Sequence, residues 1–488
     1  MRAFMAVALG LAAGISAFAI AMGLLGSLAI AFVAGGAVAA LAAWGAWIRP
    51  PVPLAANAVP RRLLILSATA TVVTLVQLAV LTVFMVAPEQ VAYSMVPDSG
   101  WEVRHSCLSA YFVAGEAVGR GGDAYDEGLY TAAGDTGVGV RKARMLGPFG
   151  IDVYEYPPPF LLVPRALRLL TTDFSRTRAL WFGLNVAVIL LAMLAVARRM
   201  GPVFATRAIL LLPMALVGMS MLNTLQKGNI QPVVIALAMV AMAWFERRRW
   251  AGGAVLLAYS ILAKLYPGML GVYLLARRQW RAAAWTAAMG VVLLAASVAD
   301  TGTAPFASFL HFLPGVLSGE AFPAFRNPGA IAINLSVPGL AFKAGLFGVP
   351  GMGFGAAKVL GWLYTAVIVF VTVRVGQRTQ ADAEKPLVWL AILILATMRS
   401  PFLPQGYGVV PALWLLTLLA ATYAPTGKTL ALVVVTAVAL NLHWPLDWPM
   451  DPRLRAVLYT IPQAITIGIA VLALRRRVGA PEGDTLTV

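Results

Sequence analysis

The sequence has little charge and almost no cysteine, and each shortage excludes a class of protein. Only 12% of its 488 residues are charged, whereas soluble domains carry roughly a quarter, so a soluble globular protein is excluded. Cys107 is the single cysteine, so no intramolecular disulfide can form. The P-loop, HExxH, CxxC and G-x-S-x-G patterns of soluble enzymes are also missing. Any chemistry must therefore come from scattered residues that the fold brings together.

Long apolar runs fill most of the chain, which is 60% hydrophobic. Runs of about 18 or more residues recur along it, as in membrane-spanning helices. We therefore predict an all-α polytopic membrane protein with about 12–14 transmembrane helices. We attribute the net charge of +17 to Lys and Arg at cytoplasmic helix ends, with a further share available for an anionic lipid substrate. Nucleic acid is not a predicted partner.

The predicted helices alternate in direction so that every short basic cluster lies in the cytoplasm. They span residues 3–24, 26–47, 63–86, 179–197, 207–222, 230–245, 282–299, 356–375, 386–398, 407–422, 429–442 and 455–474. Residues 250–276 are predicted to form a hairpin of two short helices broken at Pro267, because a single crossing would place one flanking basic cluster outside. The apolar run after Met1-Arg2 is too long for a cleaved signal peptide, so we predict an uncleaved anchor.

Two long segments, 87–178 and 300–355, remain between these helices. Both are predicted to lie on the extracytoplasmic face, the first with short interfacial helices. We expect a single transmembrane domain over the whole chain. Its parts are additional N-terminal helices in 1–62, a core region in 63–420, and C-terminal helices with a cytoplasmic tail in 421–488.

The first outer segment carries the candidate catalytic residues Asp98, Glu102 and His105. They come shortly after a helix that crosses outward, and a carboxylate or imidazole there can act as a general base on an attacking hydroxyl. The alternative for each residue is a solvated loop charge. Cys107 is predicted to be a small packed residue rather than a nucleophile.

The candidate substrate-binding residues are of several chemical kinds. Cations near the membrane surface can hold a leaving lipid phosphate, and Lys264 stands out because charge within apolar sequence is costly, although it could instead snorkel to the interface. Tyrosine and glutamate beside a run of prolines can line a site above the bilayer. Amides suit sugar hydroxyls, although they also cap helices. The set is Lys264, Lys227, Arg399, Tyr156, Glu155, Gln226, Asn229 and His443.

Several motifs occur in a fixed order along the chain. They are Gly121-Gly122-Asp123-Ala124-Tyr125-Asp126, Tyr156-Pro157-Pro158-Pro159-Phe160, Gln226-Lys227-Gly228-Asn229, a hairpin from Trp250-Ala251-Gly252-Gly253 through Lys264-Leu265-Tyr266-Pro267 to Arg277-Arg278-Gln279-Trp280-Arg281, and Arg399-Ser400-Pro401. Over residues 63–420 this order resembles the GT-C membrane glycosyltransferases. It is most similar to glycosyltransferase family 87, the polyprenyl-phosphate-mannose-dependent mannosyltransferases.

The resemblance includes one departure from the family pattern. When Tyr111 and Gly115 are aligned, the aspartate that the family usually has in its first outer loop falls at Cys107. A thiol is a poor substitute for a carboxylate base. The resemblance therefore implies that the base has moved to His105, Glu102 or Asp98, or that the activity is altered.

The resemblance implies a GT-C-like fold and a transfer reaction. A sugar, such as the hexose mannose, would move from a polyprenyl-phosphate donor to a lipid or glycan acceptor on the extracytoplasmic side of a bacterial cytoplasmic membrane. The lipid phosphate would leave, held by Lys or Arg. No cofactor is implied, and a divalent cation is left open. The alternatives are a transporter or flippase of lipid-linked glycan, an envelope polysaccharide ligase or polymerase, and an inactive relative that serves as a binding partner. Polar residues crowd the outer face rather than the midplane, which favours the enzyme.

Overall fold

Helices dominate the computed structural model, which describes residues 1–51, 55 and 59–478. Within those residues, seven helical spans are long and apolar enough to cross a bilayer, and one bent pair makes an eighth. The seven spans are α1 (Arg2–Leu25), α2 (Leu28–Ile48), α3 (Arg61–Val86), α7 (Phe174–Ala197) with η5 (Arg198–Met200), α14 (Trp280–Thr301), α18 (Phe354–Gln377), and α23 (Pro452–Leu458) with α24 (Thr460–Arg475). The predicted all-α polytopic membrane protein is therefore confirmed.

Shorter helices coincide with the other predicted crossings. The bent pair consists of α8 (Pro202–Leu211), α9 (Pro213–Leu216) and α10 (Met219–Lys227), and it turns by 65° at a break that holds Gly218. The others are α11 (Gln231–Phe245), α12 (Trp250–Ala263), α13 (Gly268–Ala276), α19 (Lys385–Thr397), α20 (Gln405–Gly408), α21 (Val410–Ala421) and α22 (Gly427–Leu440). Helices α19 and α21 are buried along almost their whole length, so they pack against protein rather than lipid. Only with such shorter helices does the number of crossings reach the predicted value of about 12–14.

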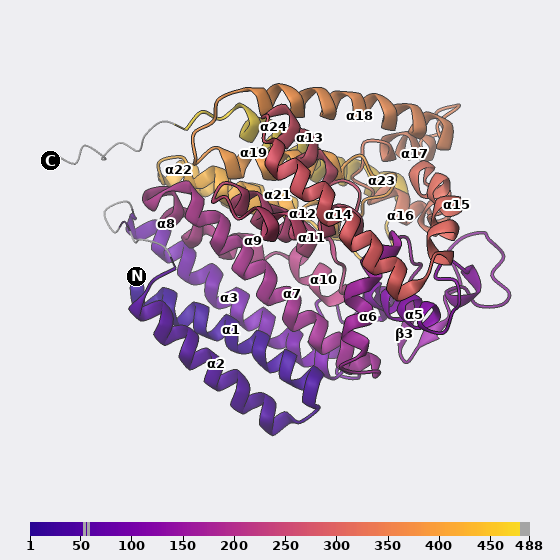
Figure 1. Ribbon diagram of the computed structural model, residues 1–488, viewed down its shortest axis with the longest axis horizontal. Helices are drawn as coiled ribbons and strands as arrows, with labels where there is room; N and C mark the ends of the chain where they lie inside the picture. The colour runs from indigo at the N-terminus through magenta and orange to yellow at the C-terminus, as the bar shows by residue number, and fades with distance from the viewer. Residues whose placement is uncertain (52–54, 56–58, 479–488) are drawn as a thin grey trace.

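The additional N-terminal helices pack onto the rest through small residues. A Cβ on Gly14 of α1 would lie 2.9 Å from the carbonyl oxygen of Gly35 on α2, and a Cβ on Gly183 of α7 would lie 2.7 Å from that of Ser16. Such close approach gives van der Waals contact between helices in lipid, where the hydrophobic effect does not join them. Helix α2 forms an outer layer of the bundle (Figure 1), and most of its side chains are exposed.

The two long segments lie together at one end of the bundle, which we call the loop end (Figure 1). The first contains η2 (Val91–Tyr93), α4 (Gly100–Arg104), α5 (Cys107–Gly119), η3 (Glu127–Leu129), η4 (Pro158–Leu161) and α6 (Leu162–Arg168), and the second contains α15 (Ala304–Ser318), η6 (Pro323–Arg326), α16 (Pro328–Ala332) and α17 (Gly339–Leu346). Nη1 of Arg326 lies 2.9 Å from Oδ2 of Asp135 and so ties the second segment to the first.

Basic clusters gather at the opposite end, which we call the basic end; the start of α1 lies at this end in Figure 1. Gln279 donates a hydrogen bond of 3.3 Å to Glu246, so the two ends of the α12–α13 hairpin meet, as the prediction for residues 250–276 requires. Nζ of Lys385 also lies 2.5 Å from the Glu246 carboxylate. Arg477, just after α24, donates to the carbonyl of Thr379. The clusters that were predicted to share one side of the membrane thus share one end of the bundle.

A small sheet within the first long segment joins residues that are far apart in the sequence. Strand β1 (His105–Ser106) pairs in parallel with β3 (Phe149–Ile151), and β2 (Met145–Leu146) pairs antiparallel with β3. In this register His105 is opposite Gly150 and Ser106 is opposite Ile151. The start of α5 therefore lies beside Asp152, the residue that follows β3.

Candidate active site

A cavity of about 930 Å³ lies at the loop end. Its walls come from both long segments, from the turns between α10 and α11 and between α12 and α13, and from residues 396–407 and 443–447. Helices α15 and α18 supply an apolar wall that includes Phe309, Leu313 and Trp362. A mostly apolar cavity with a few convergent polar groups is typical of a ligand-binding site.

Most of the predicted site residues line this one cavity. They are Glu102, His105, Glu155, Tyr156, Lys227, Asn229, Lys264, Arg399 and His443. Two predicted residues lie elsewhere. Asp98 is exposed and is not part of the cavity wall. Gln226 is buried behind the wall, where it accepts a hydrogen bond from the Met95 amide (2.7 Å) and donates one to the Glu102 carbonyl (3.2 Å), so it holds the loop in place.

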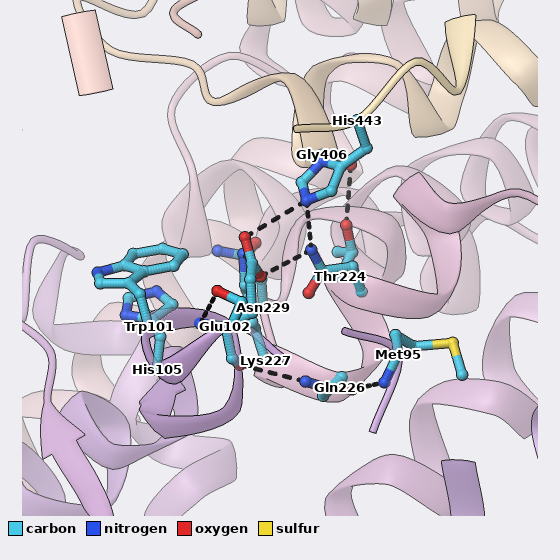
Figure 2. Close-up of polar contacts among 12 residues, drawn as sticks. Met95, Trp101, Glu102, His105, Thr224, Gln226, Lys227, Asn229, Gly406 and His443 are labelled. Carbon is cyan, nitrogen blue, oxygen red and sulfur yellow. Dashed lines mark hydrogen bonds and ion pairs between the residues drawn. The ribbon is translucent and has the colours of Figure 1, made fainter. Parts of the chain in front are cut away.

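Glu102 is the centre of a buried polar network that Figure 2 shows. The residue is only 1% exposed. Oε2 lies 2.7 Å from Nζ of Lys227 and accepts a hydrogen bond of 2.8 Å from Asn223, while Oε1 lies 3.3 Å from Nε2 of His443. The Lys227 ammonium also lies over the ring of Trp101, 4.5 Å from its centroid. The network joins α4 to α10 and to the loop that follows α22.

These contacts decide the charge of Glu102. Burial opposes its ionisation, but the charge of Lys227 and the hydrogen bond and charge of His443 outweigh burial, so the pKa of Glu102 lies well below its usual value. Both carboxylate oxygens are engaged, so Glu102 is poorly placed to take a proton from a substrate. Lys227 is likewise neutralised by Glu102, and this weakens its predicted contact with a phosphate.

Asp152 is the residue of this site that the sequence did not predict. It lines the cavity, and its Oδ2 lies 3.7 Å from Nε2 of His105. The backbone amide of Asp152 donates a hydrogen bond of 3.0 Å to Ser109, and Oδ1 accepts one of 3.0 Å from the Val153 amide. Ser109 thus holds the backbone of Asp152, and the Val153 amide holds its carboxylate. Burial and the positive charge of Lys227 lower the pKa of His105, against the opposing charge of Asp152, so its imidazole is neutral near pH 7.

Cys107 lies in the same place as Asp152 and His105. Its sulfur lies 3.7 Å from Nε2 of His105 and 3.1 Å from the Tyr407 hydroxyl, and it accepts a hydrogen bond of 3.4 Å from Asn229. Burial and the charge of Asp152 raise the pKa of Cys107 to about 12. A thiol that stays protonated is a poor nucleophile. The resemblance predicts a carboxylate at position 107, and the structure places the carboxylate of Asp152, just after β3, within 4.8 Å of the Cys107 sulfur.

Tyr156, Glu155 and Lys264 form a second polar group on the cavity wall. The Tyr111 hydroxyl donates a hydrogen bond of 2.9 Å to the Tyr156 hydroxyl, and Nζ of Lys264 lies 4.9 Å from the centroid of the Tyr156 ring. Burial and the nearby charge of Asp152 raise the pKa of Glu155 well above its usual value, against the charge of Lys264. Burial thus favours the neutral form of the Glu155 carboxyl, which can donate a hydrogen bond.

Arg399 and Asn229 complete the polar part of the wall. Nε of Arg399 donates a hydrogen bond of 2.9 Å to Thr365, and the guanidinium lies 5.7 Å from the centroid of the Trp362 ring. Its remaining nitrogens are available to an anion in the cavity. Oδ1 of Asn229 accepts a hydrogen bond of 2.9 Å from the Gln231 amide, which fixes the side chain just before α11, on the cavity wall.

A comparison with protein families assigns the chain to one family. The model described as Glycosyltransferase family 87 matches residues 154–401, just over half of the chain. The chain belongs to glycosyltransferase family 87. It is a membrane glycosyltransferase, as the resemblance in its motifs indicated. Searches of curated proteins and of solved structures found no match.

The family 87 match separates the site into two parts. Tyr156, Lys264 and Arg399 lie within the matched residues, whereas His105 and Asp152 precede them. The part of the cavity wall that carries Lys264 and Arg399 thus belongs to the matched region. The part with the carboxylate and imidazole comes from the stretch of the first long segment that precedes the match.

Proposed function

We propose that this glycosyltransferase transfers a hexose, such as mannose, from a polyprenyl-phosphate donor to a lipid or glycan acceptor. The observation that carries the proposal is a single cavity that joins an apolar, aromatic wall to a polar wall bearing both fixed cations and a carboxylate. The chain would act as one membrane domain, in a bacterial cytoplasmic membrane. Basic clusters collect at the basic end, so by the positive-inside rule the loop end and its cavity face the extracytoplasmic side.

The donor would lie along the wall formed by α15 and α18. Phe309, Leu313 and Trp362 offer the apolar contact that a prenyl chain needs. Lys264 and Arg399 line the same cavity, and an ammonium and a guanidinium stabilise the negative charge that develops on a departing phosphate. The positive charges that would stabilise the leaving phosphate, those of Lys264 and Arg399, thus lie within the matched family 87 region.

The acceptor would be activated by Asp152. Its carboxylate takes the proton of an acceptor hydroxyl as the oxygen attacks the anomeric carbon. The bond between that carbon and the phosphate oxygen breaks, and the phosphate leaves with the electron pair. His105, held between Trp101 and Asp152, is a positioning residue. Of the predicted bases, Asp98 lies outside the cavity and Glu102 is fully paired, so we assign the base to Asp152 in their place.

A transfer assay tests the proposal. Purified protein is given a polyprenyl-phosphate hexose with labelled sugar, together with candidate lipid and glycan acceptors, and both sugar transfer and release of polyprenyl phosphate are measured. We expect the two to rise together. Movement of the intact donor across a vesicle membrane without release would instead indicate a flippase and overturn the proposal.

Matched variants test the assigned residues. Asp152→Asn should lower the transfer rate by about 100- to 10,000-fold, the usual contribution of a general base, whereas Asp98→Asn, on the exposed loop, should leave it unchanged. Adding Cys107→Asp to Asp152→Asn should restore part of the rate, because it returns a carboxylate to the same wall. If Asp98→Asn is the harmful change, the assignment of Asp152 is wrong.

A second pair of variants tests the role of Lys264. Lys264→Ala should lower transfer by about 100- to 1,000-fold, as loss of an electrostatic stabiliser does. Lys358→Ala removes an exposed lysine of α18 that does not line the cavity, and we expect no effect. Equal rates for the two variants would remove Lys264 from the donor site.

A further inference from the structure

Three potential metal ligands meet on the cavity wall where β1, α5 and β3 come together. Nε2 of His105 lies 3.7 Å from Sγ of Cys107 and 3.7 Å from Oδ2 of Asp152. The three donor atoms all lie within 4.8 Å of one another. Across the residues that the structure describes, this is the one group of three or more His, Cys, Asp and Glu side chains with that spacing.

The spacing fits a shared cation better than hydrogen bonds among the three side chains. One ring nitrogen faces both the sulfur and the carboxylate oxygen, yet a single N–H can point well at only one of them, and a nitrogen–oxygen distance of 3.7 Å is too long for a hydrogen bond. With metal–ligand bonds of about 2.0–2.3 Å, neighbouring ligand atoms of a tetrahedral site lie about 3.3–3.8 Å apart. Both distances from His105 fall within that interval.

The surroundings hold each ligand in place. Asn229 and Tyr407 contact the sulfur at 3.4 and 3.1 Å, as the outer partners of a bound thiolate do. The Val153 amide occupies Oδ1 of Asp152 and leaves Oδ2 for His105. The His105 ring stacks on Trp101, with centroids 4.3 Å apart.

The choice of donors selects the type of ion. A thiolate with an imidazole and a carboxylate suits a borderline cation such as Zn²⁺ or Co²⁺, whereas Mg²⁺ and Ca²⁺ prefer oxygen ligands alone. Three protein ligands on the wall of a cavity leave a fourth position free, as in catalytic zinc sites. Lys227, which lines the same cavity, is neutralised by Glu102 and does not prevent cation binding.

We propose that His105, Cys107 and Asp152 bind one Zn²⁺-like divalent cation on the wall of the cavity. Binding would release the proton of the Cys107 thiol to solvent, and the thiolate and carboxylate then balance the charge of the ion. The site does not depend on the identity of the sugar donor. It does involve Asp152, and a carboxylate bound to the ion cannot also accept a proton from the acceptor. The loaded enzyme is therefore a resting form.

Cobalt spectroscopy tests the site directly. Co²⁺ is titrated into the purified, tag-free full-length protein, and the absorption spectrum is recorded. We expect one equivalent to produce a near-ultraviolet band from thiolate-to-cobalt charge transfer, together with visible bands of tetrahedral cobalt, and Zn²⁺ should abolish both. Cys107 is the only cysteine, so a thiolate band can come from no other residue. A spectrum without that band at saturating Co²⁺ would overturn the proposal, whatever the enzyme's activity.

Variants separate the three ligands from the fold. Cys107→Ser should lose the near-ultraviolet band, and Asp152→Asn should weaken Co²⁺ binding at least about 10-fold, as loss of even an outer partner does. Asp98→Asn is the control and should bind as the unmodified protein does. Wild-type affinity in Asp152→Asn would exclude Asp152 as a ligand. Because no donor is present, failure here is distinguishable from failure of the transfer assay.

Discussion

The Glu102–Lys227 ion pair gives a sharp test of how the first long segment is held to the helices. Both side chains are buried, and their charged atoms lie 2.7 Å apart. Glu102 belongs to the short helix α4, and Lys227 ends α10. Removing one partner leaves the other charge buried without its counter-charge. We consider Glu102→Gln, Lys227→Met and the double variant.

The size of the effect follows from burial and geometry. Breaking a buried ion pair by removing one partner costs about 3–5 kcal/mol, because the remaining charge stays desolvated. Glu102→Gln keeps the shape of the side chain and a hydrogen bond from Asn223, so we expect it to lower the free energy of unfolding by about 3 kcal/mol. Lys227→Met should lower it by about 4 kcal/mol, because the Glu102 carboxylate then keeps only His443 and Asn223 as partners. The double variant removes both charges and should cost about 2–3 kcal/mol less than the sum, the upper range for residues in contact.

The assay is reversible unfolding in mixed detergent micelles, followed by tryptophan fluorescence, for the parent protein and the three variants. The control is Lys385→Met, which breaks a pair with Glu246 at the basic end and should be additive with Glu102→Gln, since the two sites share no partners. If each single variant costs less than about 1 kcal/mol, the value of a surface pair, or if the double variant equals the sum, the buried-pair argument is refuted.

Further predictions concern pH, helix packing, donor length and metal. The pKa of Glu102 is depressed in the folded protein, so its ion pair stabilises the fold fully above about pH 4.3, the pKa of Glu in the unfolded chain. The difference in unfolding free energy between the parent and Glu102→Gln should therefore be constant above that pH and shrink by about 1.4 kcal/mol per pH unit below it. Unfolding measured at a series of pH values tests this. Gly183→Val should lower stability by about 1–3 kcal/mol, because no space exists beside α1, whereas Gly290→Val, where a Cβ meets open space, should be silent. Phe309→Ala with Trp362→Ala should raise KM for a long prenyl donor but leave a short-chain donor unaffected, which a comparison of the two donors in the transfer assay decides. One equivalent of Zn²⁺ should slow transfer, and a chelator should restore it; faster transfer with Zn²⁺ would contradict the resting form.

The sequence was sufficient to predict the helices because apolar runs and their basic flanks are local properties. The run predicted at 63–86 is helix Arg61–Val86, and that predicted at 282–299 is helix Trp280–Thr301. The hairpin at 250–276 followed from the charge rule applied to its two basic flanks. These predictions needed no knowledge of what each helix packs against.

The site could be predicted only in part, because the sequence does not show which side chains from other elements a residue contacts. Glu102 was recognised as a polar candidate, but its role depends on Lys227, which a different helix supplies. Asp152 was missed because its approach to His105 depends on the pairing of β1 with β3, two strands too short to stand out in the sequence. The available signal was indirect: Cys107 stands where the resemblance calls for a carboxylate, so one had to come from elsewhere.

Cys107 and Asp152 lie on the same wall of the cavity. Position 107 belongs to helix α5, whereas Asp152 follows strand β3 and its backbone amide is held by the Ser109 hydroxyl. The Cys107 sulfur neighbours the same imidazole as Asp152 does. The proposed base and the proposed metal site thus share one wall, and both depend on the short β1–β3 pairing. A change that disrupts this pairing without touching any side chain of the site, such as Gly150→Pro, which removes a backbone donor, should therefore lower transfer and cobalt binding together, while leaving the Glu102 network and its stability contribution intact.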